Sequence, residues 1–255
     1  MAKTYIVGNW KMNFTVGEAS LYLHKLLSRL PASRSVQVIV APSTVALQPL
    51  SLQVDRRRLK LCAQNICPYD YGAFTGETSV AQLRSIVDYV LVGHSERRLL
   101  FGETEKDIRA KVSAALRADL TPIICLGETA RERRDGETAD VLRDQLLSAL
   151  RDVSVEDLPK VILAYEPVWA ISSTRNSRLA PLDKVSDAIS LLRRTLEKTF
   201  GAELASAIPI LYGGSVSLAN ASAYLGLDGV NGLLIGGASL INSEFTGIID
   251  LAKEL

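Results

Sequence analysis

The sequence has little net charge, few cysteines and no apolar run long enough to cross a bilayer. Its 29 basic and 28 acidic residues leave a net charge of +1, so the chain lacks the positive field that attracts nucleic acid or an anionic membrane. Its three cysteines, Cys62, Cys67 and Cys125, match no zinc or disulfide spacing and favour a reducing compartment. The amino-terminal stretch has no apolar signal core. We therefore expect a cytoplasmic protein that contacts neither nucleic acid nor a membrane.

What the sequence does contain is a regular alternation of short apolar runs and longer amphipathic segments. The eight runs are Tyr5–Gly8, Val36–Ala41, Leu59–Ala63, Tyr89–Val92, Pro122–Leu126, Val161–Tyr165, Ile208–Tyr212 and Gly232–Gly236. Helical spacing of apolar residues marks the segments between them, including Gly17–Leu30, Thr104–Ala118, Asp140–Leu150 and Leu182–Phe200. Eight strand–helix units in 255 residues predict an α/β fold, a single (β/α)8 barrel that spans residues 1–255 as one domain.

One acidic residue stands where such barrels place their chemistry. Val161–Tyr165 is a continuous apolar run with β-branched residues, typical of a strand covered on both faces. Glu166 follows directly, which puts its carboxylate at the carboxyl end of that strand, and Pro167 fixes the backbone just after it. A lone glutamate at a strand end can also be a structural ion pair with a basic neighbour. The residues at the other strand ends therefore decide between the two interpretations.

Polar side chains also follow the first and fourth predicted strands. Asn9 and Lys11 come after the first, and an extended N-x-K step would put both on the same side of the backbone. Lys11 would supply positive charge for a dianionic substrate, or else form a structural ion pair. His94 and Glu96 follow the fourth strand. His94 would polarise a carbonyl or be a structural histidine, and Glu96 would hold Lys11 or pair with a neighbouring arginine.

Two glycine pairs end the last two predicted strands. They are Gly213-Gly214, which is followed by Ser215, and Gly236-Gly237. Each pair is expected to end a strand and open a helix, where backbone N–H groups bind phosphate oxygens. Barrel enzymes often bind phosphate at the loops after strands seven and eight. The glycine pairs therefore predict a phosphorylated ligand.

Together these residues would gather a carboxylate, an imidazole, an ammonium group and a phosphate cradle on one face of the barrel. The sequence has no metal-ligand cluster and no dinucleotide motif, so we expect no metal and no cofactor. The set suits removal of a proton next to a carbonyl and its return to the neighbouring carbon. Glu166 would be the base, and His94, Lys11 and Asn9 would stabilise the oxyanion of the enediolate. The loop after Glu166 is the expected lid, because an enediol phosphate needs protection from water.

The chain resembles the triosephosphate isomerase family along its whole length. The motifs that carry the resemblance, in order, are GNWKMN at 8–13, AQN at 63–65, GAFTGE at 72–77, GHSERR at 93–98, CLGE at 125–128, AYEPVWA at 164–170, YGGSV at 212–216 and GLLIGGASL at 232–240. The resemblance implies a TIM barrel that interconverts dihydroxyacetone phosphate and D-glyceraldehyde 3-phosphate without a cofactor. It also implies that Glu166 is the base and His94 a neutral electrophile.

The resemblance implies further roles, position by position. The implied substrate contacts are Asn9, Lys11, Ser215, Gly236 and Gly237, the last three of them phosphate ligands. Glu96 looks like the partner that positions Lys11, Ser95 like a residue that holds Glu166 while the lid is open, and Cys125 like a neighbour of the base. The GAFTGE segment resembles the loop by which one subunit reaches into its twin. A homodimer is therefore expected, with Thr75 touching the active-site lysine and asparagine of the partner.

The implied lid departs from the family pattern. It comprises Pro167, Val168, Trp169, Ala170, Ile171, Ser172, Ser173, Thr174 and Arg175. The family usually has Gly-Thr-Gly-Lys at the lid tip, where this chain has Ser-Ser-Thr-Arg. Ser172 replaces a glycine whose N–H contacts phosphate; serine keeps that N–H but adopts a positive φ only at a cost of about 1–2 kcal/mol. Our hypothesis is that the lid closes along a different backbone path, with the same phosphate contact through Ser172.

Three other functions are compatible with parts of this pattern. An isomerase of a four-carbon ketose phosphate would share the catalytic set and differ at the rim. A Schiff-base lyase would use Lys11 as its nucleophile. A phosphosugar-binding barrel without activity would keep the site and lose the lid, although the intact set of Asn9, Lys11, His94 and Glu166 argues against it. The sequence favours triose phosphate isomerisation over all three.

Overall fold

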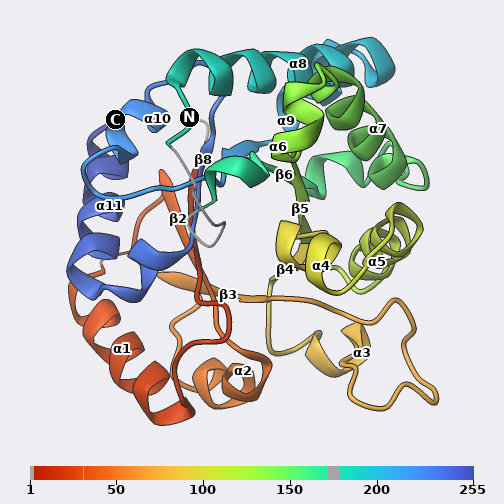
Figure 1. Ribbon diagram of the computed structural model, residues 1–255. Helices are drawn as coiled ribbons and strands as arrows, with labels where there is room; N and C mark the ends of the chain where they lie inside the picture. The colour runs from red at the N-terminus through yellow and green to blue at the C-terminus, as the bar shows by residue number, and fades with distance from the viewer. Residues whose placement is uncertain (1–2, 31, 172–178) are drawn as a thin grey trace.

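The computed structural model describes residues 3–30, 32–171 and 179–255. Eight parallel strands close into a barrel in sequence order, and the last strand pairs with the first (Figure 1). The strands are β1 (Thr4–Asn9), β2 (Val36–Ala41), β3 (Leu59–Ala63), β4 (Tyr89–Val92), β5 (Thr121–Leu126), β6 (Ile162–Tyr165), β7 (Ile210–Tyr212) and β8 (Gly232–Ile235). The predicted (β/α)8 barrel is confirmed, and every predicted strand lies within two residues of its expected bounds.

Helices connect the strands and cover the outside of the barrel. They are α1 (Val16–Arg29), α2 (Thr44–Ser51), α3 (Val80–Leu83), α4 (Ser95–Leu100), α5 (Glu105–Arg117), α6 (Ala130–Arg134), α7 (Thr138–Leu150), α8 (Leu182–Phe200), α9 (Ala202–Ala207), α10 (Ala221–Leu225) and α11 (Asn242–Glu254), with 3-10 turns η1 (Leu158–Lys160), η2 (Val168–Ala170) and η3 (Gly237–Leu240). Four helices, α1, α3, α5 and α6, begin at a Ser or Thr in a capping box, which satisfies backbone N–H groups at the helix start. This local signal fixes where those helices begin.

Two layers of apolar side chains fill the molecule. The inner layer lies inside the barrel and consists of Val7, Ile39, Ala41, Cys62, Leu91, Ile123, Cys125, Ile162, Ala164, Leu211 and Leu234. The outer layer lies between strands and helices, and includes the alternate strand residues such as Ile124 and Leu126. Because successive strand residues point to opposite faces, each strand is buried on both sides, which explains its continuous apolar sequence.

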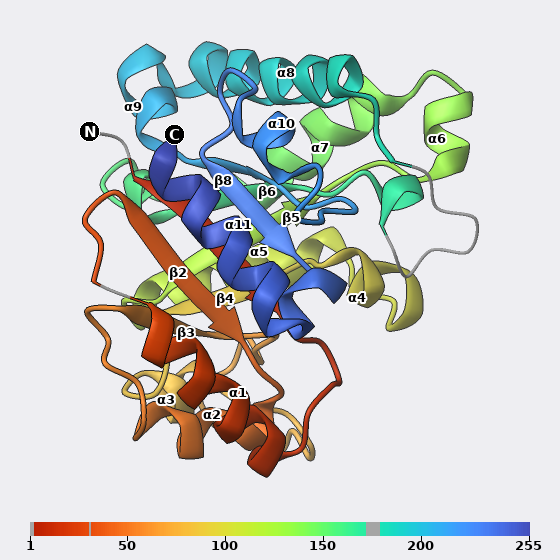
Figure 2. The same cartoon turned by 90° about the vertical axis from the view of Figure 1, so that its left-hand side faces the viewer.

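All strands are parallel, so their carboxyl ends meet at one end of the barrel, as the arrowheads of β2 and β8 show in Figure 2. Two local expectations at that end were wrong. The backbone is not extended from Asn9 to Lys11, because β1 ends at Asn9 and Lys11 has a φ of 51°. The first glycine pair does not open a helix, because α10 begins only at Ala221. None of the helices in the described residues is long and apolar enough to span a membrane.

Candidate active site

Glu166 lies just past the end of β6, with its side chain inside the barrel mouth. Only 2% of the residue is exposed, and its backbone N–H donates to the carbonyl oxygen of Leu126 at 2.7 Å. One carboxylate oxygen, Oε1, lies 3.2 Å from Nε2 of His94, and the other accepts the N–H of Ser95 at 3.4 Å. The predicted contact between Ser95 and Glu166 is thus present through the backbone. A buried carboxylate in contact with an imidazole is the central pair of the site.

Two glycines make room for Glu166. A Cβ on Gly213 would lie 2.8 Å from Cγ of Glu166, and a Cβ on Gly127 would lie 1.8 Å from its carbonyl oxygen. Heavy atoms that are not bonded to each other do not approach a Cβ so closely, so larger residues at either position would displace the glutamate. The sequence placed Gly213 in a phosphate loop and gave no sign of this second, steric role.

His94 is the N-cap of α4, and its ring is oriented by that helix. The Nδ1 atom accepts the backbone N–H of Glu96 at 3.2 Å, so Nδ1 carries no proton. In the neutral ring the proton therefore sits on Nε2, the atom that faces Glu166 and the cavity. This tautomer presents an N–H donor to any group that enters between the two side chains.

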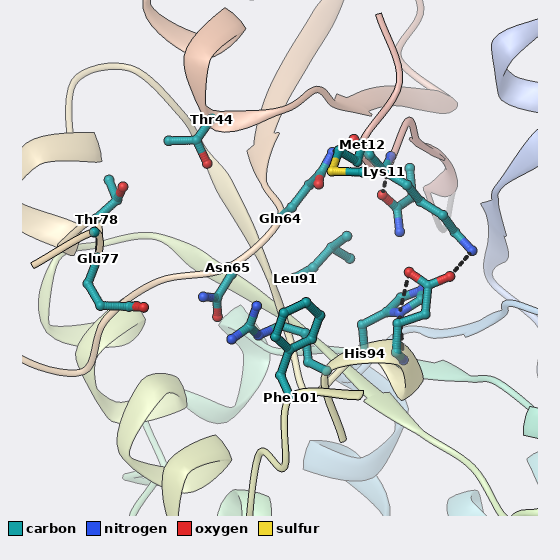
Figure 3. A pocket seen from close by; sticks show the side chains of 14 residues that line it. Lys11, Met12, Thr44, Gln64, Asn65, Glu77, Thr78, Leu91, His94 and Phe101 are labelled. Carbon is teal, nitrogen blue, oxygen red and sulfur yellow. Dashed lines mark hydrogen bonds and ion pairs between the residues drawn. The ribbon is translucent and has the colours of Figure 1, made fainter. Parts of the chain in front are cut away.

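Lys11 is held by three neighbouring side chains. Its Nζ lies 2.5 Å from Oε1 of Glu96, as predicted from the sequence (Figure 3). Its backbone N–H donates to Oδ1 of Asn9 at 3.1 Å, and its carbonyl oxygen accepts Nε2 of Gln64 at 2.8 Å. Gln64 also donates to the carbonyl oxygen of Ala41 at 2.8 Å, which ties the Lys11 turn to β2. These bonds hold the left-handed backbone of Lys11, and the role of Gln64 was not predicted from the sequence.

Arg98 binds the backbone near the pair formed by Glu166 and His94. Its guanidinium donates to the carbonyl oxygens of Gly93 at 2.7 Å and Cys125 at 3.1 Å, and it forms an ion pair with Glu105. Cys125 is buried near the end of β5 and lies close to Glu166, as the sequence predicts. Burial, together with the nearby charge of Glu166, raises the pKa of the Cys125 thiol well above its usual value, so the thiol is a neutral packing group.

The first part of the predicted lid, residues 167–171, is described by the structure, whereas Ser172, Ser173, Thr174 and Arg175 lie outside the described residues. Val168–Ala170 form the 3-10 turn η2, with Pro167 before it and a buried Ile171 after it. Nε1 of Trp169 donates to Oε1 of the buried Glu128 at 2.8 Å. The carbonyl oxygen of Ala170 accepts the N–H of Ser215 at 2.9 Å, so the start of the lid is bonded to the loop after β7.

Of the predicted phosphate residues, Gly236 borders the same cavity, whereas Ser215 and Gly237 follow cavity-lining glycines in the chain. Gly213, Gly214 and Gly236 border it together with Asn9, Lys11, His94, Glu166, Ile171 and Leu234. Gly237 is exposed and begins η3, where the first N–H groups of a helical turn have no partner within the turn. The structure thus brings together Asn9, Lys11, His94, Glu166 and the β7 and β8 loops. Within the described residues, no cluster of three or more His, Cys, Asp or Glu side chains could hold a metal ion.

A second cavity, of about 340 Å³, adjoins the site on the side of β2 and β3 (Figure 3). It shares Asn9, Lys11 and His94 with the first cavity. Its outer wall is formed by 76–78, the end of the loop that carries Thr75, and by side chains that include Met12 and Phe101. Met12 and Phe101 are 96% and 69% exposed. An open, partly apolar recess therefore lies directly beside Lys11.

The comparison with known proteins agrees with this geometry. The family model described as triosephosphate isomerase matches residues 4–252. The triosephosphate isomerase of Streptococcus mutans serotype c is 38% identical over 252 residues, which are 98% of this chain and 99% of that protein. Those of Dehalococcoides mccartyi and Caldanaerobacter subterraneus subsp. tengcongensis are each 39% identical, over 97% and 98% of this chain and 96% and 100% of theirs. The chain belongs to the triosephosphate isomerase family.

Proposed function

We propose that this member of a family of aldose–ketose isomerases interconverts dihydroxyacetone phosphate and D-glyceraldehyde 3-phosphate through an enediolate, with Glu166 as the base. The observation that carries the proposal is the buried contact between Glu166 and His94, 3.2 Å apart and beside the Lys11 ammonium group. A carboxylate removes the proton next to the carbonyl and returns it to the neighbouring carbon. No cofactor is needed, because both steps are proton transfers.

The direct contact between Glu166 and His94 leaves no space between them for a substrate carbon. The carboxylate therefore has to rotate away from His94 when substrate binds, and Nε2–H of His94 is then available to the substrate carbonyl oxygen. Lys11 and Asn9 supply positive charge and an amide donor to the same oxyanion. Each well-placed donor contributes about 3 kcal/mol to stabilisation of the transition state. Glu96 and Gln64 act through Lys11 as positioning residues.

The phosphate group is assigned to Ser215, Gly236 and Gly237, with Ser172 as a lid contact. In the structure the N–H of Ser215 is bonded to the carbonyl oxygen of Ala170. Phosphate bound at that N–H would replace this bond, so its binding would release the start of the lid. This coupling supports the assignment of residues 167–175 as a lid that responds to the phosphate.

The test is a coupled assay of glyceraldehyde 3-phosphate turnover, with free phosphate followed in parallel. We expect fast turnover by the wild type, and a fall in kcat of about 10²- to 10⁴-fold in Glu166→Gln, because the amide cannot accept the proton. Glu156→Gln, an exposed loop position, is the matched control. Little free phosphate would indicate that the Ser-Ser-Thr-Arg tip seals the site.

Three further measurements separate the alternatives. Faster turnover of a four-carbon ketose phosphate would reassign the substrate. Borohydride trapping of substrate on Lys11 would reassign the chemistry, although Lys11 is held in an ion pair with Glu96 rather than presented as a nucleophile. Binding of the triose phosphate without turnover would leave only a phosphosugar-binding protein.

We also propose that the chain forms a homodimer through the loop around Thr75. Two contacts order this loop. Cys67 and Ser79 form an isolated parallel bridge at its base, and the rings of Tyr69 and Phe74 stack with their centroids 4.6 Å apart. Thr75 is exposed at its tip. Tyr71 of this loop is 84% exposed, and Met12 and Phe101 at the recess beside Lys11 are also exposed. Large apolar side chains are therefore uncovered both on the loop and at the recess. The loop of one copy inserted in the recess of the other would bury both surfaces in a two-fold arrangement.

Sedimentation velocity tests the homodimer. We expect a dimer for the wild type and for Thr199→Arg, which places arginine on the exposed face of α8. Thr75→Arg should weaken association at least tenfold, since it buries an unpaired charge, and should lower kcat in parallel because the partner's loop supports Lys11. A wild-type monomer with full activity would refute the proposal.

A further inference from the structure

A cavity on the outside of the barrel lies apart from the active site, between α6, α7 and α8. Figures 1 and 2 show α7 beside α8 on one flank of the molecule, and α6 also contacts α7. The cavity has a volume of about 460 Å³. Its base includes Tyr165 of β6, and its walls carry Arg133 from α6 and Arg194 from α8. This size is within the range of cavities that hold small organic ligands.

The charged groups around this cavity include one cation that has no ion-pair partner among the described residues. Its lining carries three cations, Arg133, Lys184 and Arg194, and one anion, Asp187. Two further carboxylates lie next to these cations, Glu128 beside Arg133 and Asp183 beside Lys184. Lys184 is already paired, with Asp183 and Asp187, each at 3.3 Å. Arg194 forms no ion pair within the described part of the chain and is exposed. One guanidinium group at this cavity is thus without a compensating carboxylate.

Arg133 also has unused hydrogen-bonding capacity. The face of its guanidinium lies 4.0 Å from the centre of the Trp169 ring, and its nearest carboxylate oxygen, on Glu128, is 3.7 Å away, beyond hydrogen-bond distance. Stacking uses the face of a guanidinium and leaves the N–H groups at its edge available. Arg133 is the cation nearest the buried Glu128, but Trp169 and Tyr165 supply the hydrogen bonds to that carboxylate. Arg133 is therefore able to bind a second anion.

The other residues that line the cavity fit a ligand with an apolar part and one anionic end. Ala139, Ala188 and Leu191 line the cavity between the charged groups. Thr138, the first residue of the 13-residue helix α7, also faces it, and the N-cap Glu137 makes no side-chain hydrogen bond to that helix end. Arginine edges and helix N–H groups both favour the oxygens of a phosphate group.

We propose that this cavity binds an organic phosphate monoester with a compact apolar part. The phosphate lies between Arg133 and Arg194, and the apolar part lies over Ala188 and Leu191. Because Arg133 contacts Trp169, a bound phosphate changes the surroundings of that tryptophan, the middle residue of the turn η2 in the described part of the lid. The site is thus placed to report an organic phosphate to the active site from outside the barrel.

Calorimetry with phenyl phosphate tests the site. We expect binding to the wild type and to Arg143→Gln, which removes an exposed arginine of α7 that does not line the cavity. Arg194→Gln should weaken this binding about tenfold, since it removes a charge-assisted contact. Phenol should bind at least tenfold more weakly than phenyl phosphate. Any binding at the active site is common to all three proteins, so it does not alter the comparison.

Tryptophan emission supplies a second readout, excited where phenyl phosphate does not absorb. Phenyl phosphate should change the emission of the wild type, with the change weakened in Arg194→Gln and lost in Trp169→Phe, which retains the buried Trp10. Equal affinities of Arg194→Gln and Arg143→Gln, or binding of phenol as tight as that of phenyl phosphate, would overturn the proposal. Neither measurement requires turnover, so both are independent of the isomerase activity.

Discussion

At the scale of single residues, Gly213 shows how tightly Glu166, the proposed base, is enclosed. A Cβ at this position would lie 2.8 Å from Cγ and 3.4 Å from Oε1 of Glu166. Gly213 does not have a positive φ, so alanine is tolerated by the backbone and acts only through this contact. We predict that Gly213→Ala displaces the carboxylate and lowers kcat about 10- to 100-fold, because a shift of about 1 Å in a catalytic group has effects of this size.

The control for Gly213→Ala is Gly17→Ala, whose added Cβ meets nothing within 4 Å in α1. It should leave kcat unchanged and stabilise the protein by up to about 1 kcal/mol, since alanine favours the helix. Steady-state kinetics and urea unfolding of both variants give the comparison. If Gly213→Ala turns over within twofold of the wild type, Glu166 has more freedom to move than this geometry allows.

Residues whose partners are backbone carbonyls were not predictable from the sequence. Gln64 donates to the carbonyl oxygens of Lys11 and Ala41, and Arg98 to those of Gly93 and Cys125. Every residue has a carbonyl, so nothing in the sequence marks which one a distant side chain will meet. The pair formed by Lys11 and Glu96 was predictable, because both are charged and both follow predicted strands.

At the scale of elements, strands and long helices were predictable because their signals are local. Strands that are buried on both faces have continuous apolar sequences. The helices α1, α5, α7 and α8 show helical spacing of apolar residues. Short elements carry too few residues for such a signal, which is why α10, with five residues, was expected directly after the glycine pair. The turn at Lys11 was missed because its left-handed backbone is held by non-local bonds from Gln64.

At the scale of the whole molecule, closure of the barrel buries ionisable groups in their neutral form. Cys62 and Cys125 lie inside the barrel, and burial raises the pKa of each thiol above its usual value. In the unfolded chain a cysteine titrates near pKa 8.5. The native state therefore holds these protons more tightly than the unfolded state, and their contribution to stability is complete below about pH 8.5 and is lost as the pH rises above it.

We predict that the free energy of unfolding falls between pH 8 and pH 10 by about 2 kcal/mol for each of these two thiols. Urea unfolding across this range, in the presence of a reductant, measures the fall. Cys62→Ala removes one of the two groups; its cavity lowers stability at every pH, but its loss between pH 8 and pH 10 should be about 2 kcal/mol smaller than that of the wild type. Buried tyrosines with raised pKa values, such as Tyr165 and Tyr212, extend the loss above pH 10 in both proteins. Equal slopes for the wild type and Cys62→Ala would mean that the thiol inside the barrel reaches solvent without unfolding.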